Sequence, residues 1–576
     1  MVAQLRHRLG FFLLAAVIGA VVGLSTLLLI KLVLLVQWIG YGAASEIRYA
    51  DIISARPWWQ VILVPAAGGL MVGVLMQFLP GRRYHGIADV MEACAMNSAR
   101  MPVRSGLGAG LAAGISLGVG APLGREGPAV HIGASISSFL AEKLKLDHKQ
   151  SLALLGCGAA AAVAVSFNTP IAAVIFALEV VVGYYTLRVF APIVIATMVA
   201  MLVREYFLGN QTLFPVLPHA IISQWELLLF AVLGVLGALV AKSVLLLTGG
   251  FEQMWKQSSV PRWVQPALAG AFIGLVATQL PLILSIGFEG TLLALRGALE
   301  TDMLFYLLVV KLLVVCLAVS SRFAGGIFGP AIFMGAMLGG LWWAVLSITG
   351  ITLSAPGVYA TIGMAAVGSA LLGAPISTVL IVFELTGDYG ITLGVMTAAA
   401  FASTVMQSGR HGSFFRWQLA RRNINLSRGR DISLLMTQRV KDLVCNDYLQ
   451  ADEDVSIGEL SSMMGFERQR LAVFIDKEGV YRGSASLSML NAYAVDNSTD
   501  AKALEAAVSD NYCISSMTNI VAALQSMAEN ELDFIPVLDH SNKKKPKLLG
   551  VVTKSDLLSE HYDVVKRARE DEFGIT

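Results

Sequence analysis

Charged side chains are scarce in this chain. Asp, Glu, Lys and Arg make up 14% of its 576 residues, whereas a soluble globular chain carries about 25%. Hydrophobic residues make up 56%, and the mean hydropathy is +0.68. This composition excludes an ordinary soluble domain and predicts a protein that crosses a lipid bilayer several times. The formal net charge of +2 says nothing about partners, and we expect no nucleic-acid partner.

Motifs of enzymes and metal sites are missing as well. The five cysteines show no CxxC spacing, the eight histidines are dispersed, and there is no Walker loop or HExxH. Gly114-Ile-Ser-Leu-Gly118 matches the hydrolase pattern G-x-S-x-G, but its serine lies in an apolar helical stretch rather than at a strand-to-helix turn. It belongs instead to a ladder of glycines at every fourth residue from Gly106 to Gly118, which is typical of close helix packing. We therefore expect neither an enzyme nor a resident metal or cofactor.

The apolar region contains an internal duplication. Gly127–Ala134 and Gly329–Ala336 share the pattern G-P-A-[VI]-x-[IM]-G-A. In an apolar chain, duplicated segments interrupted by Gly and Pro are typical of transporters built from broken helices, whose N-termini meet near the middle of the bilayer. The backbone N–H groups at such a terminus attract anions. The duplication therefore predicts an anion path through a membrane.

Two adjacent charges, Arg125 and Glu126, lie within this apolar sequence. A charge at the bilayer centre costs roughly 2.5–3.5 kcal/mol, so such a pair must find partners or face a polar cavity. One interpretation is a structural ion pair at the membrane interface. The other places the Glu126 carboxylate just before a helix N-terminus, where it occupies the site of an anion and acts as a gate.

The matching helix of the second half opens with Gly325-Gly-Ile-Phe-Gly-Pro330. Glycine lets the backbone approach a ligand closely, and proline is tolerated in the first helical turn. Backbone amides near Ile327 and Phe328 can then point at an anion without a full charge, so the ion binds weakly enough to leave. The alternative is a tightly packed helix start without a ligand.

Three motifs together resemble the CLC family of chloride channels and transporters. They are Gly124-Arg-Glu-Gly-Pro128, Gly326-Ile-Phe-Gly-Pro330 and Phe383-Glu-Leu-Thr-Gly-Asp388, and the likeness covers roughly residues 10–425. The resemblance implies an all-α polytopic membrane domain over residues 1–432, with inverted repeats at about 50–210 and 225–407. It also implies chloride transport, a homodimer with one pore per subunit, and Glu126 as the external gate.

The same resemblance implies the residues of the anion path. They are His85, Gly86, Ile87, Arg125, Gly127, Ile327, Phe328, Gly329 and Phe415. Two of them depart from the family pattern. His85, in Tyr84-His-Gly-Ile-Ala88, stands where the family motif G-S-G-I-P has a serine, and Phe415 stands where the family has a pore tyrosine. We expect the His85 imidazole to donate a hydrogen bond to the anion in place of the serine hydroxyl, the alternative being a packed or solvated histidine.

A second duplicated pattern bears on proton coupling. Pro170 is followed nine residues later by Glu179, and Pro375 is followed nine residues later by Glu384. Proton-coupled members of the resembled family often carry an inner glutamate one residue after the position of Glu179, where this chain has Val180. We therefore expect channel-like or weakly coupled chloride movement. The alternative is a Cl⁻/H⁺ antiporter that uses another inner route, such as Glu179 or a chain of waters.

The composition changes after about Ile432 to that of a soluble α/β tail. Leu471–Ile475 and Phe534–Leu538 are expected strands, and Ile520–Met527 is an expected helix. The tail, residues 433–576, resembles a pair of CBS domains at about 436–493 and 510–562. Thr553 and Asp556 match the ribose-contacting pattern of that family, whereas the first repeat has Ser486 and Met489 there. The resemblance implies at most one intact adenine-nucleotide site.

Arginines flank the apolar region. Arg6 and Arg8 precede it, and six follow it: Arg410, Arg416, Arg421, Arg422, Arg428 and Arg430. This bias predicts that both termini are cytoplasmic, in a membrane of the bacterial inner or plasma type. A rival of another class is a membrane-anchored nucleotide sensor, in which only the CBS pair is functional. An anchor has no need of Arg125 and Glu126 in hydrocarbon, so we favour transport.

Overall fold

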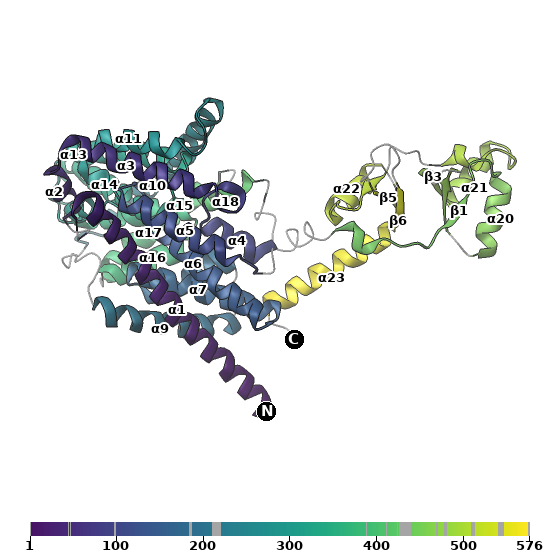
Figure 1. The fold of residues 1–576 in the computed structure, drawn as a ribbon, viewed down its shortest axis with the longest axis horizontal. Coiled ribbons are helices and arrows are strands. Elements are labelled where there is room, and N and C mark those ends of the chain that lie inside the picture. Colours follow the sequence, from purple (N-terminus) through teal and green to yellow (C-terminus); the bar gives the residue numbers. More distant parts are fainter. Residues whose placement is uncertain are drawn as a thin grey trace. The chain divides into compact units, whose positions relative to one another are not determined.

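The chain folds into two compact units, Met1–Ser427 and Arg428–Thr576, which are described separately (Figure 1). The structure is a computed structural model. It describes residues 2–43, 45, 48–96, 99–183, 187–209, 221–386, 389–409, 412–422, 424, 439–467, 470–476, 481–507, 513–530, 532–539 and 547–573. Three of the flanking arginines (Arg410, Arg428 and Arg430), the last two residues of the 383–388 motif and the side chains of residues 1–8 lie outside this description.

The first unit is helical, and its helices form two successive sets. The first set is α1 (Val2–Tyr41), α2 (Tyr49–Ser54), α3 (Trp58–Met76), η1 (Pro80–Arg82), α4 (Ile87–Met96), α5 (Val103–Gly118), α6 (Glu126–Lys143), α7 (His148–Phe167), α8 (Pro170–Phe176), η2 (Ala177–Val182) and α9 (Leu187–Leu208). The second set is α10 (Glu226–Gln257), α11 (Gln265–Ala277), η3 (Pro281–Ile283), α12 (Phe288–Leu295), α13 (Thr301–Ser320), α14 (Phe328–Ser347), α15 (Pro356–Leu372), α16 (Pro375–Thr386) and α17 (Tyr389–Gln407), followed by α18 (Phe414–Ala420).

The two sets pack in the same pattern. In the first set, α6 packs on α7, and both α7 and α1 pack on α9. In the second set, α14 packs on α15, and both α15 and α10 pack on α17. Helices α3 and α11, which are equivalent in this scheme, pack on each other, as do α8 and α16. The pattern includes α1, so the first repeat starts with that helix and not at residue 50, where the sequence-based boundary put it. The first helix lacks the Gly-Pro motifs that made the duplication visible in the sequence.

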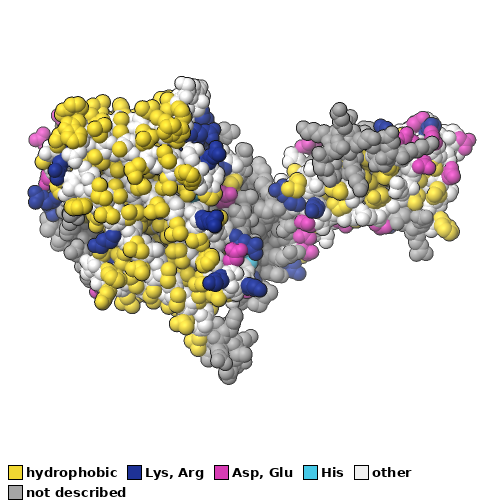
Figure 2. Space-filling view, in the orientation of Figure 1, with side chains coloured by type: hydrophobic (Ala, Val, Ile, Leu, Met, Phe, Trp, Pro, Cys, Tyr) yellow, Lys and Arg dark blue, Asp and Glu magenta, His cyan; other side chains and the backbone are white. Residues whose placement is uncertain are grey.

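The exterior of the first unit is apolar. Among the described residues, 8 helices are long and apolar enough to cross a membrane. Large hydrophobic side chains such as Leu13 (69%), Leu28 (62%) and Phe78 (81%) are exposed, and Figure 2 shows hydrophobic side chains spread over the visible face of this unit. Such a surface suits contact with lipid, as the low charge content predicts.

The glycine ladder packs helices closely, as expected from the sequence. A β-carbon at Gly106 would lie 2.7 Å from the Ser135 side chain of α6, and one at Gly110 would lie 2.7 Å from Ile132. At Gly114 it would collide with Leu32 of α1. The absent side chains therefore let α5 pack between α6 and α1.

The second unit contains two three-stranded sheets of the same topology. Within each, the first strand is parallel to the second and the second is antiparallel to the third. The strands are β1 (Leu449–Ala451), β2 (Leu471–Ile475), β3 (Tyr481–Ser486), β4 (Ile514–Ser515), β5 (Phe534–Asp539) and β6 (Lys547–Thr553). The helices are η5 (Val440–Leu443), α20 (Ile457–Glu467), α21 (Leu487–Asp496), η6 (Ala503–Ala506), α22 (Ile520–Glu529) and α23 (Lys554–Phe573).

The two sheets of this unit share an apolar cluster. It joins Leu471, Val473 and Tyr481 of the first sheet to Phe534 and Val551 of the second. Both expected strands and the expected helix are present, and the duplicated topology agrees with a CBS pair.

Candidate functional site

The broken helices of the two repeats meet at a short antiparallel bridge. Gly124 and Gly326 exchange backbone hydrogen bonds, with N···O distances of 2.8 and 2.6 Å. These two glycines open the equivalent motifs of the two repeats, so equivalent residues of the repeats meet here. The bridge places the start of α6 beside the start of α14.

The Glu126 carboxylate lies at this junction. Its Oε1 accepts a hydrogen bond of 2.7 Å from the backbone nitrogen of Phe328, the first residue of α14, and the side chain is only 3% exposed. A β-carbon on either Gly124 or Gly326 would collide with the carboxylate. The glycines therefore form a cradle (Gly124 and Gly326) that holds a negatively charged group against a helix N-terminus.

Arg125 is buried on the other side of the motif. One of its guanidinium nitrogens, Nη2, donates to the backbone oxygen of Ser166 at 3.2 Å, in the last turn of α7. A cation at a helix C-terminus is favourable. Arg125 is not among the residues that line the cavity described next, and its place in the anion path stays a prediction.

A cavity of about 170 Å³ opens beside this junction and is called the inner cavity below. Its described lining is Arg83, Tyr84, Gly86, Ile87, Gly127, Glu252, Val319, Arg322, Phe323, Gly325, Gly326, Ile327, Phe414, Phe415, Gln418 and Arg422. Five of the predicted anion-path residues are thus brought together: Gly86, Ile87, Gly127, Ile327 and Phe415.

A second, smaller cavity of about 10 Å³ adjoins the Glu126 carboxylate. Glu126, Phe328 and Ile87 line it with Val163, Phe167, Phe176, Leu372 and Ile381. Ile87 borders both cavities, so Glu126 lies next to the inner cavity with a narrow apolar space beside it. Gly329, the remaining predicted residue, packs at the bridge, where its β-carbon would lie 3.5 Å from the Cα of Gly124.

The prediction that His85 donates to the anion disagrees with the structure. The His85 Nε2 atom lies 2.9 Å from the Pro80 oxygen, its Nδ1 lies 3.4 Å from Asp89 Oδ1, and His85 does not line the inner cavity. Its ring faces that of His131, with centroids 5.5 Å apart. The backbone turns at this position, so neighbouring residues face different ways, and sequence alignment alone does not show which one faces the pore.

Sequence analysis missed a charged cluster around Asp89, in the first turn of α4. This carboxylate accepts from the Gly86 nitrogen at 2.8 Å and lies 2.5 Å from Arg83 and 3.0 Å from Arg422. The Gly86 bond caps α4, and an acidic residue in the first turn is the sequence signal that could have found it. Both arginines line the inner cavity, together with Arg322 and Glu252, and Arg422 also lies 3.5 Å from Glu92.

The structure gives Glu179 a capping role, and its role as a proton carrier stays a prediction. Its carboxylate accepts hydrogen bonds from the nitrogens of residues 376 and 377, at 3.1 and 2.8 Å, and from the Ser377 hydroxyl at 2.8 Å. In return, Glu384 accepts from the nitrogens of residues 171 and 172, at 2.9 and 2.8 Å. Each repeat therefore caps a helix of the other, and Val180 beside Glu179 is buried and apolar.

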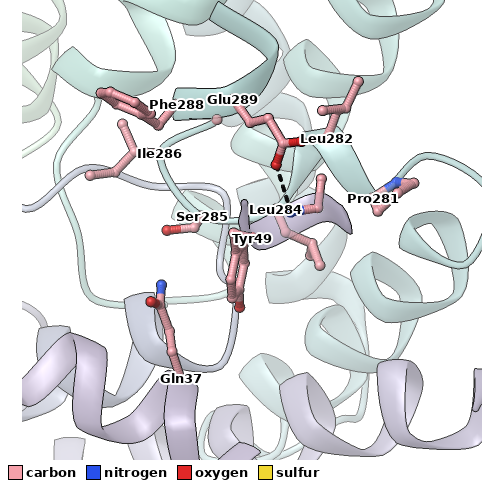
Figure 3. Close-up of a pocket in the computed structure, with 11 residues that line it drawn as sticks. Gln37, Tyr49, Pro281, Leu282, Leu284, Ser285, Ile286, Phe288 and Glu289 are labelled. Carbon is pink, nitrogen blue, oxygen red and sulfur yellow. Dashed lines mark hydrogen bonds between the residues drawn. The ribbon is translucent and has the colours of Figure 1, made fainter. Parts of the chain in front are cut away.

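A separate cavity of about 20 Å³ lies between α1, η3 and α12 (Figure 3). Both amide atoms of the buried Gln37 have no hydrogen-bond partner among the described residues, and this cavity is large enough for one water. Glu289, on its rim, accepts from the Ala50 nitrogen at 2.9 Å and thereby caps α2. The cavity is best explained as a hydration site.

Thr553 and Asp556 lie where β6 ends and α23 begins. The Thr553 hydroxyl donates to Asp556 Oδ2 at 2.6 Å, and the Asp556 nitrogen donates to the Thr553 hydroxyl oxygen at 3.2 Å. In the first repeat, Ser486 Oγ accepts from the Met489 nitrogen at 3.2 Å, and no carboxylate is present at that position. Only the second repeat therefore pairs a hydroxyl with a carboxylate.

A duplicated bundle of broken helices around a buried carboxylate defines an integral membrane transport protein. A family model described as voltage gated chloride channel matches residues 67–407, and a CBS domain model matches residues 504–563. The chain therefore belongs to the voltage gated chloride channel family, the CLC family.

Relatives with curated names are similar over most of the membrane unit. The chain is 28% identical over 402 residues to a protein of Ralstonia nicotianae named as ClcB-like chloride channel protein, covering 67% of this chain and 91% of the relative. It is 26% identical over 542 residues to the chloride channel protein CLC-e of Arabidopsis thaliana, covering 83% and 76% of the two chains.

Solved structures show the same fold. A slow cyanobacterial Cl⁻/H⁺ antiporter superposes with a TM-score of 0.63 at 20% identity, covering 72% of this chain and 97% of that one. A eukaryotic CLC transporter superposes with a TM-score of 0.60 at 18% identity, covering 96% of this chain and 98% of that one. The second match extends into the C-terminal unit, as its coverage requires.

Proposed function

We propose that this protein conducts chloride across a membrane and that Glu126 is its gate. One observation carries the proposal: a buried carboxylate occupies a glycine cradle at the N-terminus of α14, next to a cavity with arginines in its wall. A helix N-terminus favours any small anion, so a chloride ion and the Glu126 carboxylate compete for one place. Arg125, Gly329 and the amides of Ile327 and Phe328 shape that place.

The proposed transport is channel-like or weakly coupled to protons. Two observations support this: position 180 holds a valine and no acidic side chain, and the Glu179 carboxylate is hydrogen-bonded to the start of α16. The second candidate is a Cl⁻/H⁺ antiporter. It is favoured by the fold that this chain shares with the slow cyanobacterial Cl⁻/H⁺ antiporter. Anion efflux from liposomes, recorded together with proton movement, separates the two, because an antiporter moves protons at a fixed ratio to chloride.

The proposed setting is a homodimer, with one pore per subunit, in a bacterial inner or plasma membrane and with both termini in the cytoplasm. Exposed apolar side chains and the flanking arginines support the membrane placement and the orientation. We further propose that the membrane unit acts without a resident metal or cofactor and that the protein is not an enzyme.

The CBS pair is proposed to bind an adenine nucleotide weakly, at Thr553 and Asp556. A hydroxyl and a carboxylate at a strand-to-helix junction suit the hydroxyls of a ribose, while the amides at the start of α23 suit phosphates. The membrane-anchored sensor is less well supported, because an anchor does not require the Glu126 cradle.

A further inference from the structure

Tyr84 carries a buried hydroxyl in the wall of the inner cavity. The residue lines the inner cavity, yet its Oη atom is shielded from solvent and has no hydrogen-bond partner among the described residues. Buried polar groups are normally hydrogen-bonded, and an exception in a cavity wall indicates a missing ligand or water. Tyr84 directly precedes His85 and stands where the family motif G-S-G-I-P has its first glycine.

The Tyr84 ring is held in place by its surroundings. It packs beside an apolar cluster of Val72, Met76, Leu79, Ala112, Ala113 and Ala324. A β-carbon on Gly86 would lie 3.2 Å from the ring atom Cε1, so the ring lies over the start of α4. A hydroxyl on a fixed ring binds with little loss of conformational entropy.

The hydroxyl reaches the helix that carries the gate. A β-carbon on Gly127 would lie 3.2 Å from both the Tyr84 Oη atom and the Cα of Gly326. Gly127 directly follows Glu126, and Gly326 belongs to the glycine cradle. The hydroxyl therefore lies at the boundary between the inner cavity and the place that the carboxylate occupies.

Apart from the Gln418 amide, which also lines the cavity, the other candidate donors at this boundary are engaged or lack a polar group. His85 faces Pro80 and Asp89, and Phe415 presents an apolar ring to the cavity. The arginines of the wall lie near acceptors: Arg83 near Asp89, and Arg322 near the backbone oxygen of Arg82 at 3.2 Å. Among the described cavity-lining residues, Tyr84 alone carries a hydroxyl.

We propose that the Tyr84 hydroxyl donates a hydrogen bond to the monovalent anion as it passes between the inner cavity and the Glu126 cradle. The inference rests on the proposed anion transport and adds a specificity-determining side chain to it. A neutral hydroxyl is suited to this role, because it stabilises the ion through one charge-assisted bond and holds it less strongly than a guanidinium would.

Chloride binding to purified protein tests this proposal apart from transport. The parent is full-length Glu126→Gln in detergent, in which no charged carboxylate competes for the site, and calorimetric titration with sodium chloride gives its Kd. Adding Tyr84→Phe removes one oxygen and keeps the ring, so we expect Kd to rise about tenfold or more, as for the loss of a hydrogen bond to a charged group.

Tyr41→Phe in the same parent is the matched control. It also removes a buried hydroxyl, which donates to the backbone oxygen of Val119 at 3.0 Å and lies outside the inner cavity. Its Kd should equal that of the parent. An equal Kd with Tyr84→Phe, at an unchanged melting temperature, would overturn the role of Tyr84 while leaving the proposed function intact. No chloride binding by the parent itself would contradict the proposed function, and the role of Tyr84 with it.

Discussion

At the scale of single residues, the Glu126 site depends on two glycines that lack a β-carbon. The cradle works because Gly124 and Gly326 have no β-carbon where the Glu126 carboxylate lies. A chloride ion in the same place would need the same space and the same amide of Phe328. Carboxylate and anion would therefore exclude each other, and this exclusion is the physical basis of the gating that we propose.

Gly326→Ala should block the site permanently. The added methyl group would occupy the place of the carboxylate and of the anion alike, so we expect chloride efflux from liposomes to fall by at least about tenfold. Because the block does not depend on the carboxylate, adding Glu126→Gln should not restore the flux. Gly250→Ala is the control, since a β-carbon there meets nothing within 4 Å. Normal flux through Gly326→Ala would show that the cradle is not on the anion path.

Residue-level prediction from the sequence gave the position, though not a tested role, of residues that lie in a backbone motif. Glu126, Gly127 and Ile327 could be placed because Gly-Pro motifs mark helix starts. It was wrong for His85 and silent on Tyr84, since the direction of each side chain in that segment depends on contacts with α6 and η1. Such contacts join residues far apart in the sequence and leave no local pattern.

At the scale of helices, the two repeats are joined by reciprocal caps. Glu179 caps α16 and Glu384 caps α8, so each glutamate satisfies backbone N–H groups that a helix start leaves free. A carboxylate at a helix N-terminus is also favoured by the helix dipole. The Pro–Glu spacing of nine residues was visible in the sequence, but the sequence could not show that each glutamate serves the other repeat.

Glu384→Ala and Glu179→Ala should destabilise the membrane unit by similar amounts. Each leaves two backbone N–H groups of a helix start without their acceptor, which costs roughly 1–3 kcal/mol. We expect lower apparent melting temperatures in detergent for both variants, and a smaller loss with glutamine, whose amide oxygen still accepts. Glu300→Ala, an exposed residue whose side chain makes no cap, is the control. Melting temperatures equal to that of the control would rule out a capping role.

At the scale of the whole molecule, a membrane unit of inverted repeats is followed by a unit with two equivalent sheets. The sequence predicted both duplications, because Gly-Pro motifs repeat in the membrane unit and strand patterns repeat in the tail. It placed the start of the first repeat too late, since α1 carries no repeated motif and its equivalence to α10 appears only in packing.

The second unit should bind an adenine nucleotide through its second repeat only. Full-length protein titrated calorimetrically with ATP, ADP and AMP is expected to show weak binding, which Asp556→Ala abolishes and which Ser486→Ala, at the equivalent place in the first repeat, leaves unchanged. The reason is that, of the two equivalent hydroxyl residues, Thr553 bonds a carboxylate and Ser486 has none at the matching position. Absence of heat with millimolar amounts of all three nucleotides would make the unit a structural module.

The most direct test of gating is chloride efflux from liposomes that contain Glu126→Gln. Protonation of the wild-type carboxylate removes the charge that holds it at the α14 terminus, so wild-type flux should rise as the pH falls. Glutamine mimics the neutral form, so the variant should conduct faster than wild type at neutral pH and lose this pH dependence. Glu142→Gln, an exposed change on the same helix, should behave as wild type. Unchanged flux and an unchanged pH response in Glu126→Gln would contradict the account.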